Sequence, residues 1–216
     1  MKSSPLNVAA LVTVYHRHSH ADVILGKILE GYLHDGKARP GLRVASLYVD
    51  QFPVGDLSRD LAKRHGFTIY PSVAGALTLG GGRLAVDGVL SIGEHGDYPD
   101  NARGQKLYPR RRFFEGVAET FARCQKVVPV FNDKHLAATW ADAKWMYDKS
   151  RELFFPLLAG SSIPLTWRRP PLQLPRDCDL VEATPGVSAR IALQTDKGLE
   201  VVTSRRFPEM ARVPRP

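Results

Sequence analysis

The hydrophobic pattern of the chain switches repeatedly between two periods along residues 7–160. Continuous apolar runs such as NVAALVTVY (7–15) are typical of strands that are covered on both faces of a sheet. Between these runs, apolar positions recur every three to four residues, which predicts amphipathic helices. The predicted strands are 7–15, 42–50, 68–70, 85–92, 127–131 and 154–160, and the predicted helices are 19–36, 56–67, 72–82, 111–125 and 137–153.

Local signals mark the ends of several predicted helices. Ser19 is suited to cap the first helix, with Asp22 three residues later completing a variant of the capping box. Gly36 is expected to end this helix, and Gly66 the next one. These signals agree with the hydrophobic periods, so the order of strands and helices is the firmest prediction from the sequence.

Strand–helix alternation through six strands predicts an α/β fold. We expect a doubly wound, mostly parallel, six-stranded Rossmann-like sheet with helices on both faces, and right-handed crossovers. Trp140, Trp145 and Met146, all in the last predicted helix, are expected in the hydrophobic core of the domain. This domain is predicted to span 1–183. Residues 184–216 form a short C-terminal appendage with a hairpin, ARIALQT and LEVVTS, followed by a basic tail expected to be poorly ordered.

Composition places the 216-residue chain among ordinary globular proteins, with 44% hydrophobic and 24% charged residues. Its net charge of +8 suggests a polyanionic partner, but the basic residues are scattered and no nucleic-acid-reading motif accompanies them. The two cysteines, Cys124 and Cys178, lack the spacing of a zinc ribbon or disulfide framework. The first apolar run is too short to span a membrane. We therefore expect a cytoplasmic protein without nucleic-acid or membrane partners.

Polar groups follow every predicted strand. In open α/β sheets the ligand crevice lies outside the carboxyl ends of the strands. We therefore predict a crevice formed by the loops 15–20, 93–106 and 131–135, with a small polar or anionic ligand as partner. The segments that follow the six strands are HRHSH, Asp50, YPS, GEHGDYPDN, NDKH and AGSS.

Two of these loops carry candidate catalytic residues. Glu94, His95 and Asp97 combine carboxylates with an imidazole, which suits general acid–base chemistry because neighbouring groups shift one another's pKa values. After the fifth strand, Lys134 and His135 are further candidates, with Lys134 as an electrophile or proton donor. The alternative is that Glu94, His95 and Asp97 hydrogen-bond the long loop to itself, and that Asn132 or Asp133 caps the helix that follows the fifth strand.

Two passages resemble a known family. LAKRHGFTIYPSVAGAL, together with VDGVLSIGEH followed by a helix, resembles the nucleotide-binding half of the glucose–fructose oxidoreductase/inositol dehydrogenase (Gfo/Idh/MocA) family. GEHGDYPDNARGQKLYPRR, FNDKH and AGSSIPLTWRRPP are also similar to a bacterial group of oxidoreductase-like proteins. The resemblance implies NAD or NADP as cofactor. It places Asp50 at the ribose hydroxyls and His18, Ser19 and His20 beside the phosphates at the first helix.

The chain departs from this family at the positions that carry its chemistry. The glycine-rich turn after the first strand is replaced by YHRHSHAD, which contains no glycine. The family's Glu-Lys-Pro after the fourth strand is replaced by GEHGDYP, and the chain is too short for the family's second domain. We therefore expect an oxidoreductase-type protein with a polar crevice, in which these departures count against NAD(P)-dependent hydride transfer.

Two other functions remain open from the sequence. His16, His18 and His20 alternate, so in an extended backbone their imidazoles would share one face. A metal-dependent hydrolase or lyase would then bind a divalent metal with residues drawn from His16, His18, His95, Asp97 and His135. The non-catalytic alternative is a truncated partner-binding domain, or a homo-oligomer formed through the sheet or the C-terminal surface.

Overall fold

The computed structural model describes residues 4–31, 41–160, 179–184, 190–195 and 198–203. The chain divides into two compact units, 1–161 and 162–216. The boundary lies earlier than the expected division between residues 183 and 184.

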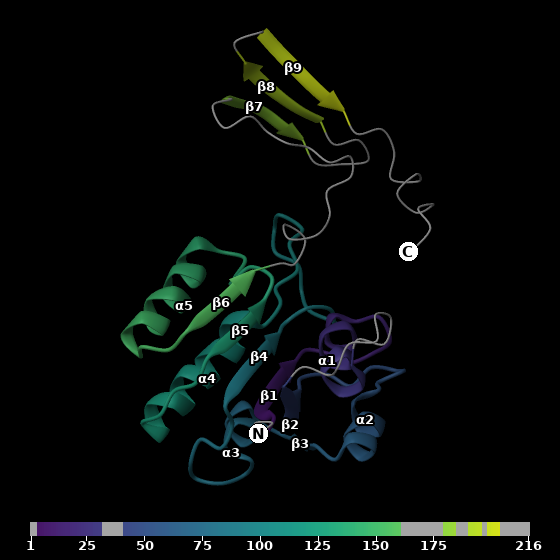
Figure 1. The fold of residues 1–216 in the computed structure, drawn as a ribbon, viewed down its shortest axis with the longest axis vertical. Helices are drawn as coiled ribbons and strands as arrows, with labels where there is room; N and C mark the ends of the chain where they lie inside the picture. Colours follow the sequence, from purple (N-terminus) through teal and green to yellow (C-terminus); the bar gives the residue numbers. More distant parts are fainter. Residues whose placement is uncertain (1–3, 32–40, 161–178, 185–189, 196–197, 204–216) are drawn as a thin grey trace. The chain divides into compact units, whose positions relative to one another are not determined.

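The first unit contains a six-stranded parallel sheet with the order β3-β2-β1-β4-β5-β6 (Figure 1). Its strands are β1 (Leu6–Val12), β2 (Leu42–Val49), β3 (Thr68–Tyr70), β4 (Gly88–Ile92), β5 (Val130–Asp133) and β6 (Leu157–Gly160). The strand order reverses between β1 and β4, which is where ligands bind in doubly wound sheets. The predicted α/β class, strand number and parallel pairing are confirmed.

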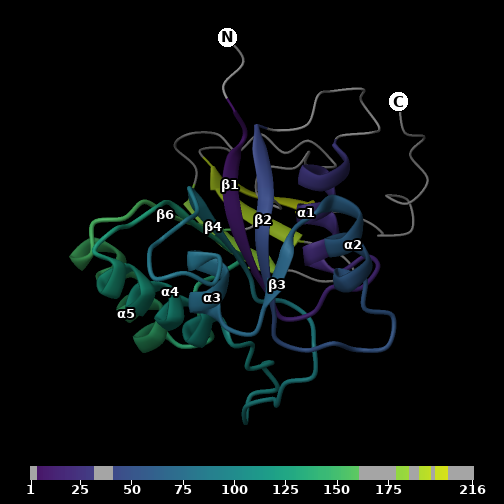
Figure 2. The same ribbon diagram turned by 90° about the horizontal axis from the view of Figure 1, so that it is seen from below.

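Helices cover both faces of this sheet (Figure 2). They are α1 (His20–Glu30), α2 (Ser58–His65), α3 (Val73–Thr78), α4 (Arg110–Cys124) and α5 (Trp140–Glu152). Alternate residues of β1 divide between two hydrophobic clusters: Ala9 and Leu11 pack with α3, α4 and α5, whereas Val8, Ala10 and Val12 pack with α1. Among the described residues, no helix is long and apolar enough to cross a lipid bilayer.

The caps that position α1 and α2 are partly those predicted. Ser19 caps α1 by accepting a hydrogen bond from the Asp22 amide, and Gly66 ends α2 in the left-handed conformation. The prediction that α1 extends to Gly36 is wrong, because the helix ends at Glu30. Gly31 follows with a φ of 85°, which favours glycine, and its N–H donates to a carbonyl of the last turn.

One of the aromatic residues expected in the core is on the surface. Met146 is fully buried and Trp145 packs against the core cluster, but Trp140 is 80% exposed. At about 100° per residue, Trp140 lies about 140° around α5 from Trp145, so the two side chains leave the helix on different sides. The prediction for Trp140 is therefore wrong.

The second unit contains a three-stranded antiparallel sheet with the order β7-β8-β9. Its strands are β7 (Asp179–Thr184), β8 (Arg190–Thr195) and β9 (Gly198–Thr203). β8 and β9 pair as the hairpin expected from the sequence, and β7, which was not predicted, adds a third strand. The expected tail beyond residue 203 lies outside the described residues.

Candidate active site

The carboxyl ends of β1, β4 and β5 bring three polar loops together. His20, after β1, contacts Asp133 at the end of β5, and both His16 and His20 contact His95, which follows β4. These segments lie far apart in the sequence and meet because β1, β4 and β5 are adjacent and parallel. Residues of the three loops that were predicted to form a crevice therefore lie together at this edge of the sheet.

One close contact at this sheet edge joins His20 and Asp133. His20 Nδ1 lies 2.6 Å from the Oδ2 atom of Asp133. The Asp133 side chain is 9% exposed and that of His20 27%, so the pair is shielded from water but still reachable from the crevice. A carboxylate that accepts from Nδ1–H fixes the imidazole tautomer and leaves Nε2 able to take up a proton.

His95 lies beside this pair. Its ring centroid is 5.1 Å from that of His20 and 5.7 Å from that of His16. Its Nε2 atom is buried and has no hydrogen-bond partner among the described residues. Burial lowers the pKa of His95, and the positive charges of His20, His16 and Lys134 lower it further, against the opposing effect of Glu94. His95 is therefore neutral at pH 7.

The lowered pKa of His95 predicts a pH dependence of stability. As the pH falls through the ordinary histidine pKa of 6.5, His95 takes up a proton in the unfolded chain before it does so in the folded protein. The free energy of unfolding therefore decreases as the pH falls below 6.5. His95→Asn removes this titration and suits the φ of 66°. Urea unfolding at pH 5 to 8 should show a shallower acid loss, by at most about 1.4 kcal/mol per pH unit. An unchanged pH profile would contradict the prediction.

Glu94 points to a different partner. Its carboxylate forms an ion pair with Arg110, the first residue of α4, whose side chain is only 3% exposed. The Nη1 atom of Arg110 also lies 3.2 Å from Nε2 of His135. A Cβ atom at Gly93 would lie 2.9 Å from Cγ of Arg110, so glycine gives the guanidinium stem its path into the crevice.

The loop before α1 does not form the extended row of histidines expected from the sequence. His18 has a φ of 65° and is exposed, so the alternation is broken between His16 and His20. The His18 amide donates to the carboxylate of Asp22 at 2.8 Å. Ser19 is fully buried and its hydroxyl caps the helix. His18 and Ser19 are therefore used to shape the start of α1.

Asp50 is surrounded by hydrogen-bond donors. Tyr48 donates to one carboxylate oxygen at 2.6 Å, and Tyr98 and Arg112 donate to the other at 2.7 and 2.6 Å. Burial alone would raise the pKa of Asp50, but the donation from Arg112, Tyr48 and Tyr98 outweighs it and lowers that pKa. Asp50 is therefore an anion whose two oxygens are already bound within the chain.

These contacts test whether a dinucleotide fits. The acid that would accept from the ribose hydroxyls, Asp50, is held by three internal donors. At the start of α1, where pyrophosphate would sit, the carboxylate of Asp22 accepts the His18 amide, and a second anion there would be repelled. The residues at these two positions do not fit NAD or NADP as they are arranged.

The remaining predicted residues lie at the rim. Asp97 is exposed, and its backbone, not its carboxylate, is fixed by two hydrogen bonds to the Gln51 side chain. His135 is exposed as a residue, but partial desolvation of its ring, and next the charge of Arg110, lower its pKa. Lys134 has a φ of 71°, and within the described part of the chain no carboxylate pairs with its ammonium group. Asp97 thus does not join Glu94 and His95.

Sequence reasoning missed Asp133 and Arg110 as members of the site. Asp133 stands in the FNDKH segment, where it was interpreted as a helix cap, and its meeting with His20 depends on the pairing of distant strands. Arg110 belongs to a run of three arginines, residues 110–112, whose sequence context does not single out one of them. The signal available for Arg110 was its place at a helix start, where a cation calls for a nearby anion.

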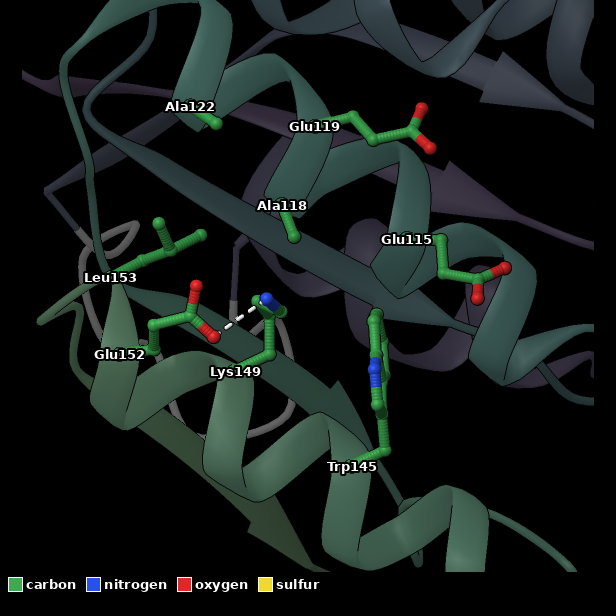
Figure 3. A pocket seen from close by; sticks show the side chains of 8 residues that line it. All are labelled: Glu115, Ala118, Glu119, Ala122, Trp145, Lys149, Glu152 and Leu153. Atoms are coloured by element: carbon green, nitrogen blue, oxygen red, sulfur yellow. Dashed lines mark hydrogen bonds and ion pairs between the residues drawn. The ribbon is translucent and has the colours of Figure 1, made fainter.

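Two other features of the first unit bear on the function. Among the described residues, no group of three or more His, Cys, Asp or Glu side chains is arranged to hold a metal ion, so the divalent-metal alternative is unsupported. A pocket of about 260 Å³ lies away from the crevice, between α4 and α5 (Figure 3). There Trp145 projects toward α4, and Lys149 pairs with Glu152 at 2.6 Å.

Comparison with protein-family models finds no match, and comparison with curated protein sequences finds none either. Solved structures do match. GenD2 from gentamicin A biosynthesis, in complex with NAD, has a TM-score of 0.47 and 16% identity, covering 73% of this chain and 35% of that one. A super-repressor mutant of Gal80p from Saccharomyces cerevisiae has a TM-score of 0.46 and 14% identity, covering 69% and 33%.

Biliverdin reductase from Synechocystis, in complex with biliverdin and NADP⁺, has a TM-score of 0.47 and 12% identity, covering 94% of this chain and 73% of that one. The chain thus spans about a third of the length of the first structures it matches. The assignment of the fold itself rests on the parallel strand order of the first unit.

Proposed function

We propose that the first unit is an oxidoreductase-type Rossmann domain whose crevice catalyses proton transfer on a small anionic ligand. The observation that carries the proposal is the 2.6 Å contact between His20 and Asp133, set beside His95, whose Nε2 atom is buried. A histidine held by a carboxylate is the arrangement that general acid–base catalysis uses most often.

In this proposal His20 Nε2 takes a proton from the ligand and returns it. Asp133 orients the ring through Nδ1 and stabilises the imidazolium that forms. His95, edge-on to His20 at 5.1 Å, has a buried Nε2 with no partner and offers a hydrogen bond to a bound ligand. His20 and Asp133 come from α1 and β5, so regular elements hold them, and His95 comes from the loop after β4.

The charges of the crevice favour an anionic ligand. Glu94 and Arg110 neutralise each other, and Asp133 is balanced by His20 once that ring is protonated. Lys134 is left with a positive charge that no carboxylate of the described residues neutralises. A carboxylate or phosphate group on the ligand would pair with Lys134 and would stabilise the imidazolium during transfer.

Proton transfer by His20 requires no nicotinamide dinucleotide. GenD2 and the Synechocystis biliverdin reductase were solved with NAD and NADP⁺, respectively. In this chain Asp50 is the acid that would accept from the ribose hydroxyls of such a cofactor. Its carboxylate already accepts hydrogen bonds from Tyr48, Tyr98 and Arg112. We therefore propose that millimolar NAD⁺ or NADP⁺ neither raises the unfolding temperature of the protein nor changes its rate of proton transfer.

Exchange of carbon-bound hydrogen for deuterium tests the proposal. The full chain is incubated in D₂O with a panel of 2-oxo acids, 3-oxo acids and sugar acids, and exchange at the acidic C–H is followed by proton NMR. We expect at least one acid to exchange faster than in buffer, and its neutral methyl ester to exchange more slowly because it cannot pair with Lys134. If no acid exchanges above the buffer rate, the proposal is wrong.

A further inference from the structure

A second pocket lies between α1 and α2, and it shares no lining residue with the His20, His95 and Asp133 cluster. Its volume is about 200 Å³, and carboxylates, one tyrosine and leucine side chains line it. We propose that this pocket binds a small organic ammonium ion, with the charged nitrogen near the tyrosine hydroxyl and a short alkyl chain on the leucines. The residues that carry the proposal are Tyr15, Asp22, Gly26, Glu30, Asp60 and Leu61.

Tyr15 gives the first reason. It is 0% exposed, and its hydroxyl is buried without a hydrogen-bond partner among the described residues. Buried hydroxyl groups in folded proteins nearly always have a partner, so an unpaired one that lines a pocket indicates a polar group of a ligand. Burial raises the pKa of Tyr15, and the charges of Asp22 and Glu30 raise it further, so both carboxylates lie near a hydroxyl that stays protonated.

Gly26 gives a second, independent reason. It lies in the interior of α1, where glycine is less favourable than alanine. A Cβ atom at Gly26 would find no heavy atom within 4 Å, so packing within the chain does not require glycine there. Any side chain at this position would project toward open space that belongs to the pocket. Glycine therefore keeps the pocket open.

The charge of the pocket selects a cation. Among the described residues that line the pocket, three carboxylates, of Asp22, Glu30 and Asp60, stand against one cation, Arg64, whose guanidinium lies 3.5 Å from Glu30. The ring of His65, outside the pocket lining, also lies 3.8 Å from Glu30. Leu61 and its leucine neighbours give the pocket an apolar wall. Within the described residues no set of three side chains has a metal-binding arrangement, and a bare metal ion would gain nothing from the apolar wall. An alkylammonium ion matches both the carboxylates and the leucines.

Butylammonium is the probe for this site. Titration of the full chain, followed by calorimetry and by amide NMR shifts, should show saturable binding of butylammonium. Binding of 1-butanol or butyrate, which share its alkyl chain, should be at least tenfold weaker. If 1-butanol binds as tightly, the carboxylates are not used and the ammonium site is wrong.

Two variants locate the binding. Gly26→Leu fills the pocket and should abolish saturable binding while leaving the unfolding temperature unchanged or raised, because leucine is the better helix former. Tyr15→Phe removes only the hydroxyl and should weaken binding several-fold. Val23→Ala changes an exposed residue of the same helix outside the pocket and should bind as the wild type does. Unchanged binding in both Gly26→Leu and Tyr15→Phe would overturn the proposal.

Discussion

Replacing His20 with glutamine is expected to lower the rate of proton exchange in the acid that the wild type turns over by about 10²- to 10⁴-fold. Glutamine keeps the approximate length and polarity of histidine but cannot take up a proton near pH 7. The loss should fall on kcat, because in the proposed function Lys134 binds the charge of the ligand, and the substitution leaves Lys134 in place. The measurement is the exchange rate in D₂O as a function of acid concentration.

Asp133→Asn tests the partner of His20. The amide can still form a hydrogen bond to Nδ1, but it no longer favours the tautomer or stabilises the imidazolium, so the exchange rate should fall by about 10²-fold or more. The double variant with His20→Gln should lose little beyond the single His20→Gln variant, because the two residues act as one unit. Additive losses would contradict this coupling.

His18→Asn is the matched control for His20→Gln. His18 is a histidine of the same loop, but it is exposed and only its backbone amide has a role, in donating to Asp22. Asparagine tolerates its φ of 65°. The exchange rate of His18→Asn should stay within twofold of the wild type. A large loss would mean that the loop, and not the ring of His20, determines the rate.

The fold could be predicted because its signal is local. Ala9 and Leu11 face one helical layer while Val8, Ala10 and Val12 face the other, and both sets are apolar. A strand covered on both faces therefore appears in the sequence as an unbroken apolar run, and the alternation with helices then leaves few topologies other than a parallel, doubly wound sheet.

The site could be predicted only in its position. The strand ends indicated which loops would meet, but the contact of His20 with Asp133 depends on β1 and β5 both pairing with β4. His18 and His95 both have a positive φ, and the residue types in their two loops do not predict this backbone conformation. Because of these two backbone conformations, His95 turns toward His16 and His20, whereas His18 remains exposed.

The three consecutive arginines at the start of α4 show the same limit. Their sequence context is nearly identical, yet Arg110 is buried against Glu94, Arg111 pairs with Glu115, and Arg112 binds Asp50. Position around the helix determines which of them reaches Glu94, and the partners of Arg110 and Arg112 lie in segments outside the helix. Their place at a helix start indicates that these cations need nearby anions, but it does not indicate which anions serve.

Arg110→Met is expected to destabilise the first unit by about 3 kcal/mol. The methionine has much of the apolar volume of the arginine stem, but it leaves Glu94 without its cation at a position where the Arg110 side chain is 3% exposed. Urea unfolding followed by the far-UV helix signal measures this loss, since all the described helices belong to the first unit.

Lys144→Met is the control for Arg110→Met, because it removes a cation from an ion pair of 2.5 Å whose two side chains are both more than half exposed. Water solvates the remaining Asp148, so the loss should be below about 0.5 kcal/mol. Adding Glu94→Gln to Arg110→Met should recover part of the stability, since the unpaired charge is then removed. If Arg110→Met costs no more than Lys144→Met, the pair of Glu94 and Arg110 is solvated in the folded protein and does not anchor the loop after β4.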